Sequence, residues 1–233
     1  GAGRNTPRYG GFERIILLDY SRTQLEQAQQ RLGTSERYVY VAADAYHLPF
    51  VAGLCDAATM IRTLHHMADA PAALQQVRSV LQPGGTFILE FASKLNLKAI
   101  LRYGLRRQSW SPFSPEPIEF AALNFDFHPV TVRAGVKTAG FTLQRQLTVS
   151  HYRMGLFKKL IPLPMLVWMD SLAQLTGDWW QLSPSVFTRS QAVGSSPLAA
   201  TGTRFACPAC ASPIADTPPE LTCPACKRTY PAA

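Results

Sequence analysis

Residues 14–33 read RIILLDYSRTQLEQAQQRLG, and this stretch decides the fold class. Its first part, an apolar run that ends at Asp19, is typical of a buried β-strand. Ser21 predicts the N-cap of an amphipathic helix over 22–32, and Gly33 ends the helical pattern. Because a strand joined to a helix in this order is the repeating unit of a parallel sheet, we predict an α/β protein.

The same alternation continues toward the C-terminus. Apolar runs predict further strands at 38–43, 57–62, 86–91, 141–151 and 185–191, and amphipathic runs predict helices at 70–81 and 131–139. This order is that of a Rossmann-like, doubly wound sheet. Residues 94–128 break the alternation, and we interpret them as an insertion or lid after the strand at 86–91.

Composition sets broad limits on the class of protein. The chain has 233 residues, of which 47% are hydrophobic, enough for one medium domain and a small module. Its formal charge of +8 weakly favours anionic partners such as nucleic acid or acidic lipid. No apolar run reaches the ~18 residues of a membrane span, and the N-terminus lacks the pattern of a signal peptide. We therefore predict a cytoplasmic protein.

A glycine-rich start and an acidic strand end form a candidate nucleotide site. Gly1-Ala2-Gly3 opens the chain, and the first predicted strand ends at Asp19. In nucleotide-binding α/β folds, such glycines let the backbone approach the ligand, and an acidic residue at the end of the fold's second strand accepts hydrogen bonds from both ribose hydroxyls. Taken alone the pattern is weak, because a glycine-rich start followed by an acid often arises by chance.

Three further motifs follow in order: Ala43–Phe50 (ADAYHLPF), Asp56–Ala58 with Leu64-His65-His66, and Leu81–Phe87 (LQPGGTF). With the glycines and Asp19, they make residues 1–191 resemble the class I S-adenosylmethionine (SAM) dependent methyltransferases of the quinone- and sterol-methylating type, methyltransferase type 11. The resemblance implies the SAM methyltransferase fold, with SAM as cofactor.

The resemblance also implies which residues bind SAM. The implied cofactor-binding residues are Gly1, Ala2, Gly3, Asp19, Tyr20, Asp44, Ala45, Ile61 and Arg62. Among them, Asp19 would contact the ribose, Asp44 and Ala45 the adenine, and Ile61 and Arg62 the methionine portion.

Two features depart from that family's pattern. Asn5 stands at the third glycine position of the loop, so the turn into the next helix is expected to differ. The strand that should precede Gly1 is absent from the sequence, and this strand is central in the family's fold. We therefore expect a split sheet that lacks its first strand, in a fragment of a longer protein.

The catalytic residues are not identified by the sequence. Methyl transfer is an in-line displacement at an activated carbon, so the protein mainly aligns the acceptor and excludes water. If the acceptor is a phenol or an enol, four side chains are candidates for taking its proton, from their position alone: His65, His66, Glu90 and His128. The alternative for the histidines is an ordinary packing or capping role.

Two segments are candidates for contact with the methyl acceptor. Lys94, Lys98, Arg102 and Arg106 recur every four residues, as they would along one face of a basic helix. Such a helix can lie on an anionic membrane or phosphate, or it can be the solvated face of a lid. The Trp-bearing stretch 156–180 could seat an isoprenoid or lipid, or form an ordinary lid or dimer face; its prolines argue against a membrane span.

The C-terminal region contains two CxxC pairs separated by twelve residues. This spacing can bring four thiolates into a closed, tetrahedral structural zinc site, with the ligands Cys207, Cys210, Cys223 and Cys226. We predict a zinc ribbon over 205–233, joined by a linker at 192–204. The ribbon resembles the small activator subunit that partners tRNA and protein methyltransferases, and ribbons of some rRNA guanine methyltransferases.

Three functions remain open from the sequence. The first is SAM-dependent methyl transfer to a small-molecule or lipid-like acceptor, with the ribbon as a structural or protein-docking appendage; such a protein could also make peripheral membrane contact. The second is an RNA methyltransferase, acting on rRNA or tRNA, whose ribbon binds the substrate. The third is a catalytically silent partner protein with the SAM methyltransferase fold.

Overall fold

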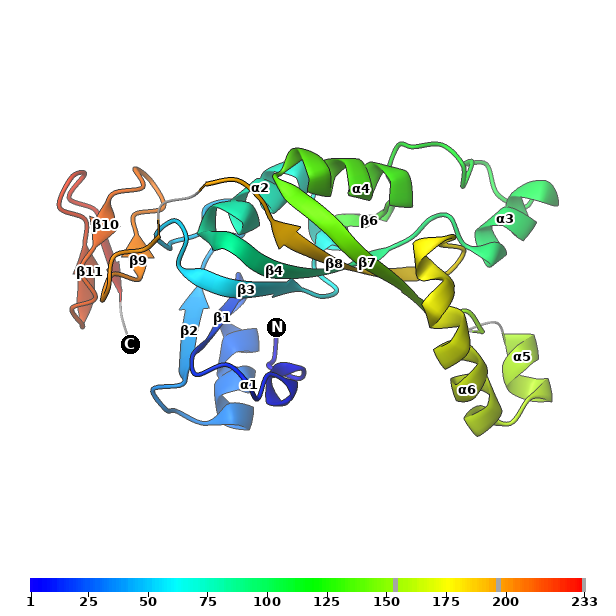
Figure 1. Ribbon diagram of the computed structural model, residues 1–233, viewed down its shortest axis with the longest axis horizontal. Helices are drawn as coiled ribbons and strands as arrows, with labels where there is room; N and C mark the ends of the chain where they lie inside the picture. Colours follow the sequence, from blue (N-terminus) through cyan, green and yellow to red (C-terminus); the bar gives the residue numbers. More distant parts are fainter. Residues whose placement is uncertain (153–154, 196–197, 232–233) are drawn as a thin grey trace. The chain divides into compact units, whose positions relative to one another are not determined.

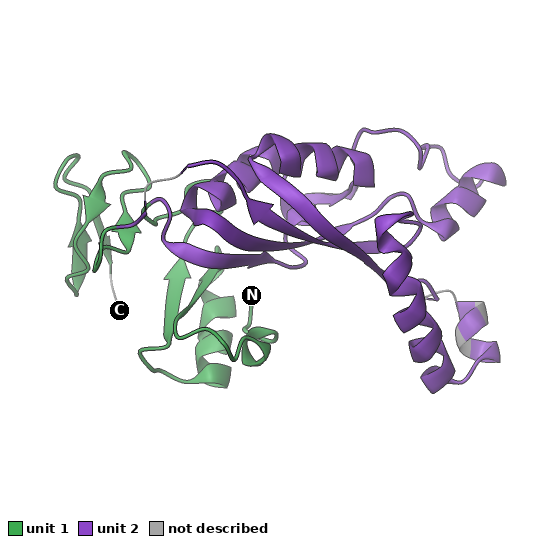
Figure 2. Cartoon of the chain, in the orientation of Figure 1, with its two compact units in different colours: residues 1–51, 200–233 green, residues 52–199 purple. Residues whose placement is uncertain are grey.

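The computed structural model describes residues 1–152, 155–195 and 198–231. The chain forms two compact units (Figure 2). Unit 1 consists of residues 1–51 and 200–233, and unit 2 consists of residues 52–199. The domain boundary near residue 191 and the linker at 192–204 stay predictions.

The N-terminal part of unit 1 is the expected strand–helix–strand. After a short 3-10 helix η1 (Thr6–Arg8), strand β1 (Ile15–Asp19) runs parallel to β2 (Tyr38–Ala42), and α1 (Arg22–Leu32) connects them (Figure 1). The Ser21 hydroxyl accepts a hydrogen bond from the amide of Gln24 at 3.4 Å, which confirms the predicted cap. The small core between helix and sheet is made by Leu17, Leu25 and Ala28.

The C-terminal part of unit 1 is built from two short antiparallel pairs. Strand β9 (Phe205–Ala206) pairs with β10 (Pro213–Ile214), and β11 (Glu220–Thr222) pairs with β12 (Thr229–Pro231). The buried core of this ribbon consists of Cys207, Ile214, Leu221 and Cys223. Because two of these four side chains are cysteines, the apolar core alone is too small to stabilise the fold.

Unit 2 contains a four-stranded mixed sheet in the order β3-β4-β8-β7. Strand β3 (Cys55–Met60) runs parallel to β4 (Leu81–Ala92). Strand β8 (Ser185–Ala192) is antiparallel to both β4 and β7 (Phe141–Val149). The sheet is therefore not wholly parallel, and the two parallel strands of unit 1 form a separate two-stranded sheet.

Two long helices contribute to the core of unit 2. Helix α2 (Ala70–Val80) contacts α4 (Pro129–Thr138), and both supply side chains to the cluster around Phe87 and Phe141. Helix α2 ends at Val80, one residue before the predicted end, because β4 already begins at Leu81. Helix α4 begins two residues earlier than predicted, because the side chain of His128 caps its first turn.

Two segments extend from the sheet of unit 2. Between β4 and α4 lie α3 (Leu97–Gly104) and a hairpin of β5 (Ile118–Ala121) and β6 (Asn124–Asp126). Between β7 and β8 lie α5 (Gly155–Leu160), α6 (Leu163–Gln174) and the 3-10 helix η3 (Leu175–Asp178). Of the helices in the described ranges, none has the length and apolar character needed to cross a bilayer.

The structure corrects one detail of the predicted basic helix. Lys94 precedes α3 and is buried at 2% exposure, so it does not belong to the exposed stripe. Its ammonium donates to the carbonyl oxygen of Glu116 at 2.6 Å. Lys94 therefore links the start of the inserted segment to the residues before β5. Burial lowers the pKa of its ammonium group.

Candidate cofactor and metal sites

The N-terminal glycines of unit 1 have different structural constraints. Gly3 has a φ of +67°, and a Cβ there would lie 2.9 Å from Leu32 Cδ1 and 3.2 Å from Ala28 Cβ. A larger residue would be strained by the positive φ and would crowd Leu32 and Ala28 of α1. Gly1 has open space where a Cβ would stand, and its amino group pairs with the Asp19 carboxylate. The structure thus brings the glycine loop to the end of β1, where the resemblance placed the ribose contact.

Asp19 and Asp44 are linked by the backbone of unit 1. The amide of Ala43 donates to the carbonyl oxygen of Asp19 at 3.2 Å. The carboxylate of Asp19 accepts from the amide of Ser21 at 2.8 Å, and that of Asp44 accepts from the amide of Tyr46 at 2.9 Å. Both carboxylates are partly exposed, so each can still accept hydrogen bonds from a ligand.

The neighbouring candidates are accessible in different degrees. Tyr20 is 84% exposed, and Ala2 is buried. The ring of His47 lies 3.4 Å from the carboxylate of Asp44, a contact that the sequence analysis did not predict. Ala45 follows Asp44 in the same turn, in which the amide of His47 donates to the carbonyl oxygen of Asp44 at 3.0 Å.

The ribbon pairs with the segment that follows this turn, within the same unit. Phe50 and Phe205 form an antiparallel bridge, and their rings stack with centroids 6.1 Å apart. The amide of Val51 donates to the carbonyl oxygen of Arg204, and that of Ala206 to the carbonyl oxygen of Pro49, each at 3.1 Å. The ribbon is therefore attached to the loop by main-chain hydrogen bonds, a contact that the sequence did not predict.

The four predicted metal ligands converge in the ribbon. All four sulfurs lie within 4.8 Å of one another, with Cys207 to Cys226 at 3.6 Å and Cys210 to Cys223 at 3.5 Å. A zinc ion about 2.3 Å from each of four sulfurs would hold them roughly 3.8 Å apart. The donor set and its spacing therefore fit a structural zinc ion with no open coordination position.

The two CxxC turns have matching backbones. In each turn a residue after the second cysteine has a positive φ: Ala211 at 59° and Lys227 at 61°. Each of these residues donates its amide to the carbonyl oxygen of the first cysteine, at 2.8 and 3.1 Å. The hydroxyl of Tyr230 lies 3.2 Å from the sulfur of Cys207 and, as the largest effect, lowers the pKa of this thiol to about 6. A thiolate, the form that binds metal, is thereby favoured.

In unit 2, Glu90 holds the turn that follows β3. This buried carboxylate accepts from the amide of Arg62 at 2.8 Å and from the hydroxyl of Ser185. Arg62 has a φ of 56°, so the hydrogen bond fixes an uncommon backbone conformation. The structure thus brings together Glu90 and the predicted contacts Ile61 and Arg62. Ser185 was missed, because nothing in the local sequence relates it to Glu90.

The three candidate histidines have distinct surroundings. His65 and His66 lie in the 3-10 helix η2 (Leu64–His66), with ring centroids 4.0 Å apart. Burial, followed by the neighbouring His66, lowers the pKa of His65. The ring of His66 is 3.1 Å from the carbonyl oxygen of Leu123.

His128 has a clear structural role. Its Nδ1 accepts a hydrogen bond from the amide of Val130 at 3.2 Å and so caps α4. Burial, with Lys94 and Arg133, lowers its pKa, which favours the neutral ring that a cap requires.

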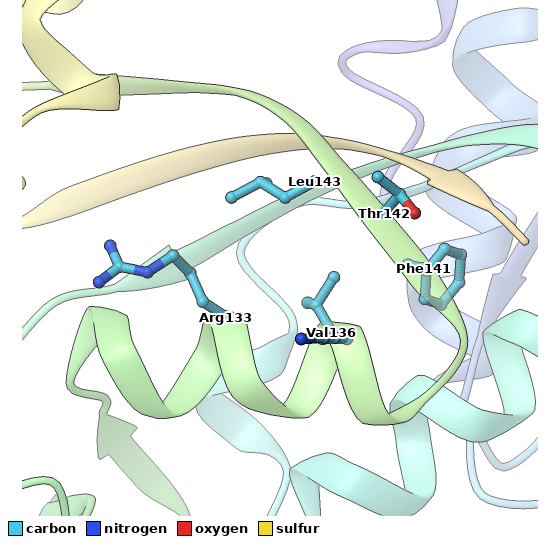
Figure 3. A pocket seen from close by; sticks show the side chains of 6 residues that line it. Arg133, Val136, Phe141, Thr142 and Leu143 are labelled. Carbon is cyan, nitrogen blue, oxygen red and sulfur yellow. The ribbon is translucent and has the colours of Figure 1, made fainter.

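A pocket of about 270 Å³ lies between α4 and β7 in unit 2 (Figure 3). Its lining residues are Arg133, Val136, Lys137, Phe141, Thr142 and Leu143. None of the candidate cofactor, catalytic or metal residues lines it, so we do not assign it to the predicted site.

Known proteins resemble this chain in sequence and in fold. Residues 1–89 match the family described as a methyltransferase domain. A 2-phytyl-1,4-naphtoquinone methyltransferase of Trichormus variabilis is 35% identical over 88 residues, which are 36% of this chain and 38% of that protein. The chain thus spans well under half of the length of this relative.

Two solved structures share the fold. One is a complex between the Haloferax volcanii Trm112 methyltransferase activator and a methyltransferase, with a TM-score of 0.56 and 16% identity over 83% of this chain and 80% of that chain. The other is an S-adenosylmethionine dependent methyltransferase of Mesorhizobium loti, with a TM-score of 0.53 and 16% identity over 77% and 80%. Residues 1–89 of this chain thus match the methyltransferase domain family, and the chain has the fold of SAM-dependent methyltransferases.

Proposed function

We propose that this chain binds SAM and takes part in methyl transfer to a lipid-like acceptor of the quinone type. The observation that carries the proposal is the arrangement of Gly3, Asp19 and Asp44. Gly3 approaches α1, and the main-chain carbonyl oxygen of Asp19 accepts a hydrogen bond from the amide of Ala43, the residue before Asp44. The naphtoquinone methyltransferase among the relatives supports the class of acceptor.

Each residue has a defined task in this proposal. SAM, when bound, supplies a methyl group activated by its positively charged sulfur. Asp19 accepts hydrogen bonds from the ribose hydroxyls, and Asp44 accepts one from the adenine amino group. The backbone amides of Ser21 and Tyr46 donate hydrogen bonds to these carboxylates and already hold them in place. The two side chains therefore lose little conformational freedom when SAM binds.

His65 is the proposed proton acceptor for a phenolic or enolic acceptor. Its lowered pKa keeps the ring neutral near pH 7, the form that can take a proton. Glu90 has both carboxylate oxygens in hydrogen bonds, so in this proposal it positions Arg62 and does not act as a base.

The first test is calorimetric titration of the full chain with SAM. Asp19→Ala removes an acceptor for two hydroxyls and should weaken binding at least about tenfold, because hydrogen bonds to charged groups are worth roughly 1.5–3 kcal/mol each. Glu13→Ala is the matched control, since this exposed acid precedes the same strand. Equal SAM affinities of the two variants would contradict the role of Asp19, and no SAM binding by the folded, zinc-loaded parent would favour a silent partner protein.

RNA methylation is a second candidate, favoured by the exposed Lys227 and Arg228 of the ribbon. Contacts to phosphate make affinity fall steeply with salt concentration. Titration of the full chain with a structured RNA at several salt concentrations checks this function. The double variant Lys227→Gln with Arg228→Gln should reduce the slope of log affinity against log salt concentration by about two, roughly one for each cation removed. The activator complex among the structural neighbours supports a docking role of the ribbon as the alternative.

A further inference from the structure

The segment between β7 and β8 presents a large apolar surface. Trp168, Trp179 and Trp180 are 62%, 79% and 59% exposed. Leu163, Val167 and Leu172 of α6 are also at least half exposed. We call these six side chains the Trp face. An exposed apolar surface with several large aromatic side chains marks a site of interaction.

The same segment is fixed to β7 and its end. The carboxylate of Asp170 accepts from the amide of His151 at 2.9 Å and contacts its ring at 2.8 Å. Asp178 accepts from the amide of Gln146 at 2.6 Å. A Cβ at Gly177 would lie 2.6 Å from the carbonyl oxygen of Gln146, so η3 lies directly on the strand. The six exposed side chains of the Trp face therefore belong to a well-anchored segment, whose two acidic residues both serve contacts to β7 and its end.

The basic helix α3 begins next to the end of the Trp-bearing segment. The amide of Leu97, the first residue of α3, donates to the carbonyl oxygen of Leu182 at 3.1 Å, two residues after Trp180. Both α3 and α6 lie toward the same end of unit 2 in Figure 1. The exposed cations of this segment are Lys98, Arg102, Arg106 and Arg107, and residues 91–115 contain no acidic residue.

Apolar side chains accompany the cations on α3. Leu97, Leu101 and Leu105 are each more than two fifths exposed. Together α3 and the Trp face offer exposed tryptophans, exposed leucines and a cluster of positive charge. This is the composition of a surface that lies in the headgroup region of a membrane, where aromatic rings and aliphatic groups enter and cations meet lipid phosphates.

We propose that α3 and the Trp face dock unit 2 on an anionic phospholipid bilayer. The positive charge argues for anionic lipid over an uncharged apolar partner or a second copy of the same surface, which would repel itself. The docking does not require SAM or methyl transfer, so it can be tested independently of the proposed function. Docking would place the protein at the membrane, in which a lipid-like methyl acceptor dissolves.

Sedimentation of the full chain with lipid vesicles tests this surface. Vesicles of phosphatidylcholine with about a third phosphatidylglycerol should bind it at least about tenfold more tightly than phosphatidylcholine alone. Arg102→Gln with Arg106→Gln should weaken binding about fivefold per charge removed. The matched control is Arg22→Gln with Arg31→Gln, two exposed arginines of the amphipathic helix α1, which should bind as the parent does.

Trp168→Ser with Trp179→Ser tests the apolar part. This variant should also bind anionic vesicles at least about tenfold more weakly, with parental circular dichroism and zinc content. The parent's tryptophan fluorescence should shift to shorter wavelength with anionic vesicles. The proposal is overturned if the parent does not bind anionic vesicles, if both arginine pairs have equal effects, or if the Trp face is covered by a second copy of the chain in sedimentation equilibrium.

Discussion

The ribbon of unit 1 and the end of the β3–β4 pair in unit 2 both gather ionisable side chains, but different forces hold them together. The ribbon places four cysteine sulfurs within 4.8 Å of one another. As thiolates they would repel, so a cation has to join them. Glu90 instead meets two neutral donors, the amide of Arg62 and the hydroxyl of Ser185. The folding of the ribbon should therefore depend on metal, whereas the stability of the β3–β4 end should depend only on the hydrogen bonds that Glu90 accepts.

Removal of a metal ligand should have the largest effect. Cys223→Ser, or a chelator, is expected to unfold the ribbon, because zinc binding by such small modules contributes on the order of 10 kcal/mol to folding. Hydrogen exchange measured by mass spectrometry should show rapid exchange of the amides in 205–231 and parental protection in β4 and β8.

Cys55→Ser is the matched control for this experiment. Burial, followed by the neighbouring Asp56, raises the pKa of the Cys55 thiol to about 11, and this cysteine lies outside the four-cysteine cluster. The variant should keep one zinc ion per chain. Loss of protection in β4 after chelation, or an intact ribbon in Cys223→Ser, would contradict the comparison.

Removal of the buried carboxylate should have the next largest effect. Glu90→Ala leaves the amide of Arg62 and the hydroxyl of Ser185 without their acceptor, at a cost of about 2–4 kcal/mol in the free energy of unfolding. Glu90→Gln keeps an acceptor oxygen and should cost less. Urea unfolding measures both, with Glu26→Ala on the exposed face of α1 as control. A loss of zinc in Glu90→Ala without a loss of stability would show that the two regions are not independent.

Contacts between residues close in sequence could be predicted, and contacts between distant residues could not. The cap of α1 involves Ser21 and Gln24, and each CxxC turn involves five residues, so both follow from local patterns. Ser185 and Glu90 are 95 residues apart, and only the pairing of β8 with β4 brings them together. The bridge between Phe50 and Phe205 likewise depends on the tertiary fold.

The spacing of charged residues in the sequence did not show which of them are exposed. The spacing of Lys94 with Lys98 and Arg102 predicted a common helix face, yet Lys94 is buried and bonded to the carbonyl oxygen of Glu116. Periodicity states which residues share a face but not where a helix begins. The cofactor contacts Asp19 and Asp44 were named from the family resemblance, and the structure adds the backbone bond that links them.

The smallest effect is expected from His65. Its substitution tests whether the stability of unit 2 near the end of β3 and β4 depends on pH. Burial and the neighbouring His66 lower the pKa of His65 below the 6.5 of the unfolded chain. Its contribution to stability is therefore fully present above pH 6.5 and is lost as the pH falls through the lower, folded value. From about pH 8 to about pH 5.5, His65→Gln should lose less stability than the parent in urea unfolding, by under about 1 kcal/mol because solvent screens the partly exposed ring. His65→Asn should behave in the same way if titration and not packing is the cause, and parallel pH profiles of parent and variants would refute it.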